Sequence, residues 1–337
     1  MSNQTSPSVQ AGRVKANEVD GEAIAQLLPI MILIVIANGL VFILFAKRKE
    51  LRTPPNYVLF SLAVCDLTTG VISIPVFIFV ALTPVITSSE LKFYLGFLVV
   101  VLNNLTAISA CYHILAATTG KYLSIIWPVT HRLIKRKTVI KALGAVWIGS
   151  VIVAFIPFAW VNMEDKALQT NLSIGHVIFC LITVFLLPYS FMIYAFVVIF
   201  LAISKQGRSH RKKPSKQRSS RQARQAALEK RCLILFASMA TIFLVCWLPW
   251  YVLMLLFGIS YNGDALRILS HVFVLVRYTT SVINPMLYTF FRRDFKTALK
   301  SLFQSRRSRM SSLLVERKND CDKAAEKSPE RTDEQYV

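Results

Sequence analysis

The chain has 337 residues, of which 54% are hydrophobic and only 17% are charged, and its mean hydropathy is +0.51. A composition this apolar excludes an ordinary soluble domain and is typical of a membrane protein. The formal net charge of +21 would suit a nucleic-acid-binding protein. The basic residues, however, gather in short segments between apolar ones, so we expect no nucleic-acid partner.

Seven apolar segments are long enough to cross a bilayer as a helix, which takes about 20 residues. They cover approximately residues 24–45, 56–81, 93–123, 139–159, 175–203, 232–258 and 266–291. The sequence therefore predicts an all-α fold, a seven-transmembrane helix bundle in a lipid bilayer.

Basic residues follow the first and third apolar segments and are dense over residues 205–231, whereas the alternate loops are nearly neutral. Positive loops stay on the cytoplasmic side, which predicts an extracellular N-terminus and a cytoplasmic C-terminus. Residues 1–23 then form an extracellular tail, and they lack the apolar core of a cleavable signal peptide. Residues 304–337 are charged, Ser-rich and poor in aromatics, so we expect a disordered cytoplasmic tail.

Two short motifs on segments expected to face outward, at Asn3 and Asn171, fit the pattern for N-glycosylation. The six cysteines show no spacing that indicates disulfides or a metal site. No nucleophile and base form a recognisable catalytic motif, so the sequence predicts neither an enzyme nor a cofactor, apart from a possible sodium ion discussed below.

Several apolar segments contain a polar residue at the depth of the hydrocarbon core. Asp66 lies in the second, Asn38 in the first, and Asn284 with Pro285 in the seventh. An ionisable group at that depth is a functional hypothesis by default. Asp66 can equally be a structural hydrogen-bonding centre with Asn38 and Asn284, and both interpretations stay open. For His113 in the third segment we favour helix packing over pH sensing.

Linked motifs appear in a fixed order along these segments. They are Asn38-Gly39, Thr53-Pro54-Pro55-Asn56-Tyr57, Leu62-Ala63-Val64-Cys65-Asp66, Trp147, Pro188, Cys246-Trp247-Leu248-Pro249 and Asn284-Pro285-Met286-Leu287-Tyr288. Over about residues 24–303 the chain resembles the rhodopsin-like (class A) G-protein-coupled receptors.

The resemblance implies three groups of site residues. A ligand pocket in the outer half of the bundle would be lined by Asn103, Asn104, Ala107, Cys180, Trp247, Arg277 and Tyr278. A polar cavity, which in similar receptors often holds sodium, would be lined by Asn38, Asp66, Thr106, Ser281 and Asn284. An activation switch would comprise Lys121, Tyr122, Glu229, Phe243, Pro188, Pro249, Pro285 and Tyr288.

After Tyr288 an amphipathic pattern predicts a short eighth helix on the inner membrane surface. Its apolar side would be formed by Phe291, Phe295, Leu299, Leu302 and Phe303, and its basic side by Arg293, Lys296 and Lys300. The domain of seven spans and this helix covers residues 24–303.

The inner end of the third segment departs from the family pattern. Similar receptors have Asp-Arg-Tyr where this chain has Gly120-Lys121-Tyr122. The cation remains without its neighbouring acid, although Glu229 at the foot of the sixth segment can still pair with Lys121 and hold the inactive state. With one restraint missing, we expect raised basal activity or altered coupling.

The pocket positions disfavour two ligand classes. Amine receptors carry an Asp where this chain has Asn103, and opsins carry a Lys where it has Tyr278. Arg277 is a permanent cation about midway along the seventh segment and must find a partner. It can bind an anionic ligand group, pair with Asp66, or stack on Trp247 or Tyr278. Pairing with Asp66 is slightly favoured.

These features predict a plasma-membrane receptor that transmits an extracellular, small-molecule signal to heterotrimeric G proteins, with arrestin as a further partner through the Ser-rich tail. A seven-helix decoy or scaffold that binds without signalling is the alternative, and a transporter or channel is less favoured because repeated broken helices and rows of charged residues are lacking.

Overall fold

A computed structural model describes residues 20–210, 216–259, 264–302 and 304 of the chain. All regular structure within these residues is helical. The chain divides into two compact units, Met1–Arg292 and Arg293–Val337, which are described separately. The tail expected over residues 1–23 lies almost entirely outside the described residues, and so does the expected cytoplasmic tail from residue 305 onward.

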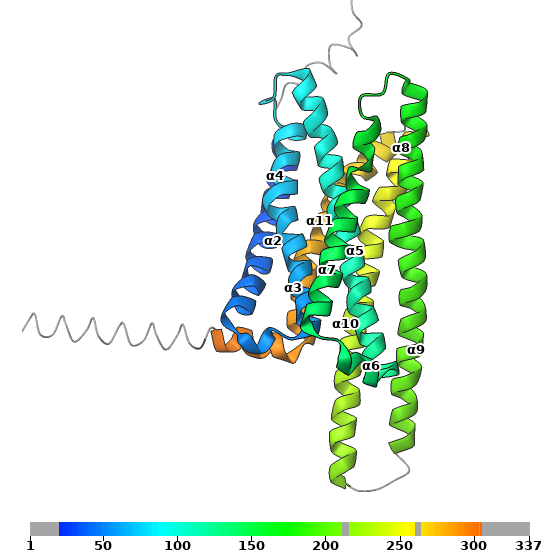
Figure 1. The fold of residues 1–337 in the computed structure, drawn as a ribbon. Helices are drawn as coiled ribbons and strands as arrows, with labels where there is room; N and C mark the ends of the chain where they lie inside the picture. The colour runs from blue at the N-terminus through cyan, green and yellow to red at the C-terminus, as the bar shows by residue number, and fades with distance from the viewer. Residues whose placement is uncertain (1–19, 211–215, 260–263, 303, 305–337) are drawn as a thin grey trace, which may run out of the picture. The chain divides into compact units, whose positions relative to one another are not determined.

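The first unit is a bundle of long helices joined by short connections (Figure 1). Its helices are α2 (Gly21–Lys47), α3 (Pro54–Thr68), α4 (Ile74–Phe77), α5 (Ser89–Ile126), α6 (Pro128–Leu133), α7 (Arg136–Phe155), α8 (Lys166–Cys180), α9 (Leu187–His210), α10 (Lys216–Gly258) and α11 (Asp264–Phe291). Each predicted span coincides with one helix or one continuous run of helices. The short helix α6 and the 3-10 turn η1 (Lys49–Leu51) lie in connections that we had expected to be loops.

Side-chain caps fix where several helices begin. Asp20 accepts a hydrogen bond from the Ala23 amide before α2, and Asp165 accepts two, from Ala167 and Leu168, before α8. Ser88 plays the same part before α5. Each cap satisfies an amide that the first turn of a helix leaves without a partner.

The second and fifth spans each contain a wide π-helical turn close to a proline. The turn η2 (Thr69–Ser73) precedes Pro75, and η5 (Leu181–Leu186) precedes Pro188. A proline ring clashes with the carbonyl four residues earlier, and a wider turn relieves this clash without ending the helix. The segments from Pro54 to Leu82 and from Lys166 to His210 are therefore each one continuous helical span that contains π-helical turns.

Among the described residues, six stretches of helix are long and apolar enough to cross a membrane: Gly21–Lys47, Pro54–Leu82, Ser89–Ile126, Arg136–Trp160, Lys166–Lys205 and Arg224–Gly258. Helix α11 is the seventh span but is less apolar, because Arg277, Asn284 and several hydroxyl residues lie along it. It packs against α2, α3 and α10, so neighbouring helices surround its polar positions. The predicted seven-helix fold is confirmed.

The segment 205–231 corrects one expectation. We expected a basic loop there, but α9 continues to His210 and α10 begins at Lys216, so helix fills most of it. Lys, Arg, Gln and Ala are good helix formers, and they dominate this segment. Both helices extend beyond the end of the bundle where α6 lies, which we call the α6 end (Figure 1). The opposite end, where α8 begins, is the α8 end.

The second unit contains a helix over residues 293–302. Phe295, Ala298 and Leu302 are buried and lie three or four residues apart, so they share one face. Arg293, Lys296 and Lys300 are exposed. The amphipathic eighth helix is thus present, whereas Phe303 lies outside the described residues.

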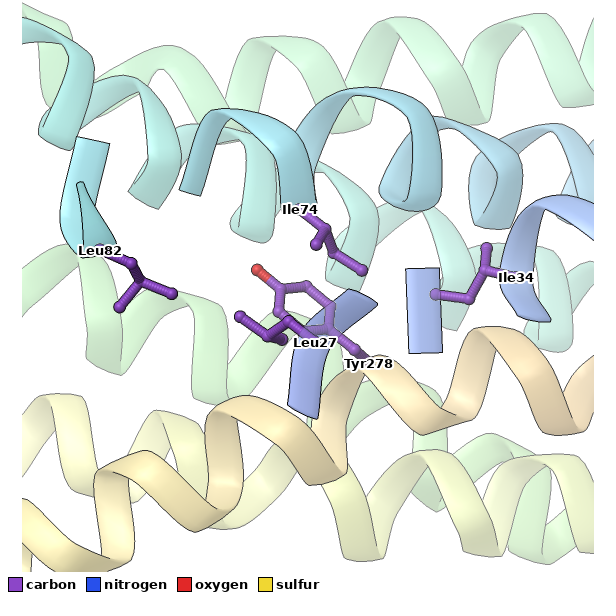
Figure 2. Close-up of a cluster of buried hydrophobic side chains, with 5 residues drawn as sticks. All are labelled: Leu27, Ile34, Ile74, Leu82 and Tyr278. Atoms are coloured by element: carbon purple, nitrogen blue, oxygen red, sulfur yellow. The ribbon is translucent and has the colours of Figure 1, made fainter. Parts of the chain in front are cut away.

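Close packing joins α2 to the second span around a small apolar cluster of Leu27, Ile34, Ile74, Leu82 and Tyr278. Figure 2 shows the ring of Tyr278, from α11, lying among these aliphatic side chains. Nearby, a Cβ atom added at Gly70 would lie 2.8 Å from Cγ2 of Ile34. Glycine at position 70 is therefore what allows the two helices to approach.

We expect Gly70→Ala to lower the stability of the purified receptor in detergent by about 1–3 kcal/mol, because the stiff, buried side chain of Ile34 cannot easily yield. The measurement is the midpoint of thermal unfolding. Gly144→Ala in α7 is the matched control, since no neighbouring atom lies within 4 Å of a Cβ there. Equal midpoints for the two variants would contradict the close-packing argument.

Candidate functional site

A proline in α11 leaves a backbone carbonyl that another helix satisfies. Pro285 lacks the N–H that would bond to the carbonyl of Ser281. The side-chain amide of Asn38, from α2, donates to this carbonyl at 2.8 Å and to its own helix at Ile34, at 3.0 Å. Asn38 is 1% exposed. A side chain thus replaces the missing proline N–H, as buried helices in a membrane require.

Asp66, from α3, bonds to side chains on the same stretch of α11. Its Oδ2 accepts a hydrogen bond of 3.1 Å from Asn284 Nδ2, and the side chain of Ser281 bonds to it as well. The carboxyl group is buried. These contacts tie α2, α3 and α11 together. The side chain of Thr106, also predicted for the polar cavity, makes none of these bonds: its hydroxyl donates to the Asn103 carbonyl of its own helix. The backbone carbonyl of Thr106 accepts from Cys65 Sγ, next to Asp66, at 3.6 Å.

The same repair occurs at two further prolines. Cys111 Sγ donates to the carbonyl of Val184 at 3.0 Å, four residues before Pro188. His176 Nε2 donates to the carbonyl of Val153 at 3.0 Å. That carbonyl lies four residues before Pro157, where α7 gives way to a 3-10 turn. Sequence reasoning missed both donors.

A chain of hydrogen bonds centred on His113 joins α7, α3 and α5. Trp147 Nε1 donates to Ser61 Oγ at 3.0 Å, and that hydroxyl lies 2.7 Å from His113 Nε2. The other ring nitrogen, Nδ1, lies 2.6 Å from the carbonyl of Ser109, which only accepts. Nδ1 therefore carries the proton, and Nε2 accepts from Ser61. Both ring nitrogens are satisfied, which fits the packing role expected for His113.

The side chain of Arg277 lies among aromatic rings in the interior of the bundle. Its side chain is 1% exposed, and its Cζ lies 3.9 Å from the ring centroid of Trp250, 4.8 Å from that of Tyr278 and 5.9 Å from that of Trp247. Nη2 donates to the Tyr278 hydroxyl at 3.2 Å. Nε and Nη1 have no hydrogen-bond partner.

Two tyrosines connect this surrounding to α5. The hydroxyl of Tyr278 donates to Asn103 Oδ1 at 3.0 Å, and that of Tyr251 donates to Asn104 Oδ1 at 3.1 Å. On the α11 side, Trp247 Nε1 donates to the Thr280 hydroxyl at 3.3 Å. We call the set Asn103, Asn104, Trp247, Trp250, Tyr251, Arg277 and Tyr278 the arginine cluster.

Most residues predicted to line the ligand pocket meet in the arginine cluster. Two do not make its contacts: Cys180 lies beside His176, at 3.7 Å, and Ala107 is fully buried in α5. Sequence reasoning missed Trp250 and Tyr251. A signal existed, because Trp247 and Trp250 are three residues apart and share a helix face.

The hypothesis that Arg277 pairs with Asp66 is not what the structure shows. Within the described residues Arg277 forms no ion pair, and Asp66 bonds instead to Asn284 and Ser281. The separation has a simple cause, since Ser281 and Asn284 lie about 6 Å and about 10 Å further along α11 than Arg277. The stacking alternative matches the geometry, with Trp250 as the nearest ring.

The expected switch residues lie along α5, α9, α10 and α11. Phe243 stacks on Trp247 and on Phe185, each at 5.9 Å between ring centroids. Tyr122 packs against the apolar cluster of Ile199, Ile203 and Leu233, next to Phe196. Tyr288 is fully buried in α11, on the helix that contains Pro285.

No ion pair joins Lys121 to Glu229 in the described part of the chain. Glu229 accepts a hydrogen bond of 3.0 Å from Gln225, one turn earlier on α10. Both expected partners are half-buried. The acid and the base therefore stand apart in this conformation.

Of the two expected glycosylation sites, Asn171 is exposed on α8, while Asn3 lies outside the described residues. No group of three or more His, Cys, Asp or Glu residues that would hold a metal ion occurs where the chain is described.

Comparison with known proteins identifies the class of this chain. The model of the family "7 transmembrane receptor (rhodopsin family)" matches residues 37–288. The chain belongs to this family: it is a multi-pass membrane protein of the rhodopsin-like receptors and not an enzyme.

Curated relatives differ in what their names say they bind. The chain is 25% identical to 5-hydroxytryptamine receptor 7 of Xenopus laevis, covering 86% of this chain and 79% of the relative. It is 27% identical to adenosine receptor A2b of Rattus norvegicus, with coverage of 82% and 88%. It is 24% identical to medium-wave-sensitive opsin 1 of Sciurus carolinensis, with coverage of 89% and 84%.

We expect Asn284→Ala to destabilise the receptor by about 1–3 kcal/mol, because Asp66 Oδ2 loses a buried hydrogen-bond donor. Asp66→Asn alone should also lower the midpoint of thermal unfolding. The double exchange Asp66→Asn/Asn284→Asp restores an amide facing a carboxyl group and should be more stable than either single exchange. A double variant no better than the worse single one would argue against a direct bond.

Proposed function

We propose that this chain is a plasma-membrane receptor that transmits the binding of an extracellular small molecule to a heterotrimeric G protein. The match to the receptor family over residues 37–288 carries the proposal. The arginine cluster supports it, because it gathers aromatic and polar side chains from three helices in the interior of the bundle. Binding sites of this composition are common between helices.

The proposed orientation places the α6 end in the cytoplasm. The C-terminal end of α2 and the helix α6 lie at this end, as do the extensions of α9 and α10 (Figure 1). Lys47 ends α2, Arg52 follows it closely, and Arg132 is in α6. The connections at the α8 end are close to neutral. Short basic connections are retained on the cytoplasmic side during insertion.

The proposed mechanism is a population shift between two arrangements of α10. A ligand that contacts Trp247 or Trp250 more favourably in one arrangement raises the population of that arrangement. Phe243, stacked below Trp247, continues the contact along α10. Pro249 lies between the two tryptophans and lacks the N–H that would bond to the carbonyl four residues earlier. The missing bond makes α10 easier to bend at that point.

We also propose a sodium ion as a modulator at Asp66. The carboxyl group, the Ser281 hydroxyl and Asn38 Oδ1, which is buried without a hydrogen-bond partner, are oxygen ligands of the type that hard cations take. The thermal unfolding midpoint should be higher in sodium than in an equal concentration of potassium. Asp66→Asn should abolish the difference, and a difference that survives this exchange would place the ion elsewhere.

The receptor function is tested by basal second-messenger output, cyclic AMP and calcium, in cells expressing matched surface levels of the chain. We expect output above that of untransfected cells, because Gly120 replaces the acid that neighbours the cation in similar receptors. Gly120→Asp should lower the output several-fold. Lys121→Ala should lower it more than Glu229→Ala, since Glu229 bonds within its own helix.

Background output from all four chains, together with ligand binding, would favour the decoy or scaffold function instead. The altered motif Gly120-Lys121-Tyr122 and Phe196, which replaces the usual Tyr of similar receptors, keep this second function open. Second-messenger output at background, without any ligand binding, would contradict both the receptor function and the decoy or scaffold function.

A further inference from the structure

We propose that the ligand of this receptor carries an anionic group, of the carboxylate type, and that the Arg277 guanidinium binds it. The inference rests on the proposed receptor function and names the chemical class of its ligand. Arg277 is 1% exposed, and two of its nitrogens, Nε and Nη1, have no hydrogen-bond partners.

The polar groups around Arg277 are suited to an anion. Tyr278 uses its hydroxyl twice, accepting from Arg277 and donating to Asn103. Tyr251 directs its proton to Asn104. Each asparagine oxygen already accepts one hydrogen bond, and each amide also has an NH2 donor that takes no part in these bonds. The arginine cluster therefore offers unused donors and contains no carboxylate.

The electrostatic balance points the same way. Asp66 is the acid in the interior of the described bundle, and its contacts are Asn284 and Ser281, further along α11. A guanidinium in a low-dielectric interior carries a desolvation cost that aromatic contacts offset only in part. A carboxylate can accept from two guanidinium nitrogens at once, and such paired, charge-assisted bonds are strong. A cationic ligand would meet repulsion from Arg277.

Binding at Arg277 involves α10 directly. Trp250 is half-buried and its ring lies 3.9 Å from the guanidinium, while Nε and Nη1 are covered by protein. An anion reaches these buried nitrogens only when a neighbouring side chain moves, and the ring of Trp250 is the nearest of the three aromatic rings. Since Trp250 follows Pro249, occupation of the site changes a contact of α10 at its weakest point.

The test uses the purified full-length chain and its thermal unfolding midpoint, a readout that does not need signalling. The probes are the potassium salts of phenylacetate, indole-3-acetate and octanoate, each compared with its neutral primary amide, and potassium chloride in zwitterionic buffer is a separate arm. We expect at least one carboxylate to raise the midpoint by several degrees while its amide does not. Arg277→Gln should weaken the apparent affinity by about tenfold or more, and Arg277→Lys should retain part of the effect.

Lys92→Gln is the control, because it removes one exposed positive charge at the α8 end and should leave the carboxylate effect intact. If chloride alone stabilises the wild-type chain through Arg277, the anion is inorganic and not an organic carboxylate. Equal shifts from acids and amides would overturn the proposal, and so would the absence of any shift in the wild-type chain. A chain that signals but shows neither anion effect keeps the proposed function and loses this inference.

Discussion

The interior of this receptor depends on side chains that replace backbone hydrogen bonds lost at prolines. Lipid cannot satisfy a freed carbonyl, so a side chain or a local change of helical register must do so. Three donors do so: Asn38 for Pro285, Cys111 for Pro188 and His176 for Pro157. Each bond crosses from one helix to another, which makes every one of these bends also a point of attachment.

The bend at Pro285 shows how this constraint organises the polar interior. Asn38 donates a hydrogen bond to the freed carbonyl of Ser281. Asn284, directly before the proline, donates one to Asp66. The buried carboxyl group is therefore satisfied by the helix segment that the proline loosens. Arg277, two turns earlier, has no comparable support and rests on aromatic rings. Asp66 of α3 is thus satisfied by α11, whereas Arg277 of α11 keeps two nitrogens without partners. Asp66 is therefore a structural position, and Arg277 retains the capacity to bind a further group.

Much of the fold could be predicted from the sequence, because apolar segments of bilayer length and their spacing identify the seven spans. A structural interpretation of Asp66 with Asn284 was one of the two left open, and the structure contains that bond. The backbone carbonyls that Asn38 bonds were not predicted. The pairing chosen for Arg277 is not what the structure shows. A linear sequence does not say which way a side chain points around a helix, and the rings of Trp250 and Tyr278 are nearer than Asp66.

The helix over residues 205–210 and 216–231 was missed for a related reason. Hydropathy marks where a span leaves the membrane, whereas helix propensity decides where the helix ends, and here the two differ. The ion pair between Lys121 and Glu229 depends on the relative position of two long helices. No local pattern in the sequence encodes that position.

The length of α10 gives its bend a mechanical consequence. From Pro249 to Lys216 the helix runs for about 50 Å. A tilt of about 5° at the proline would carry the far end through about 4 Å, the width of a side chain. A rearrangement too small to resolve among the packed rings near Trp250 would thus be amplified, by leverage alone, into a displacement that a protein partner at the α6 end would meet as a different surface.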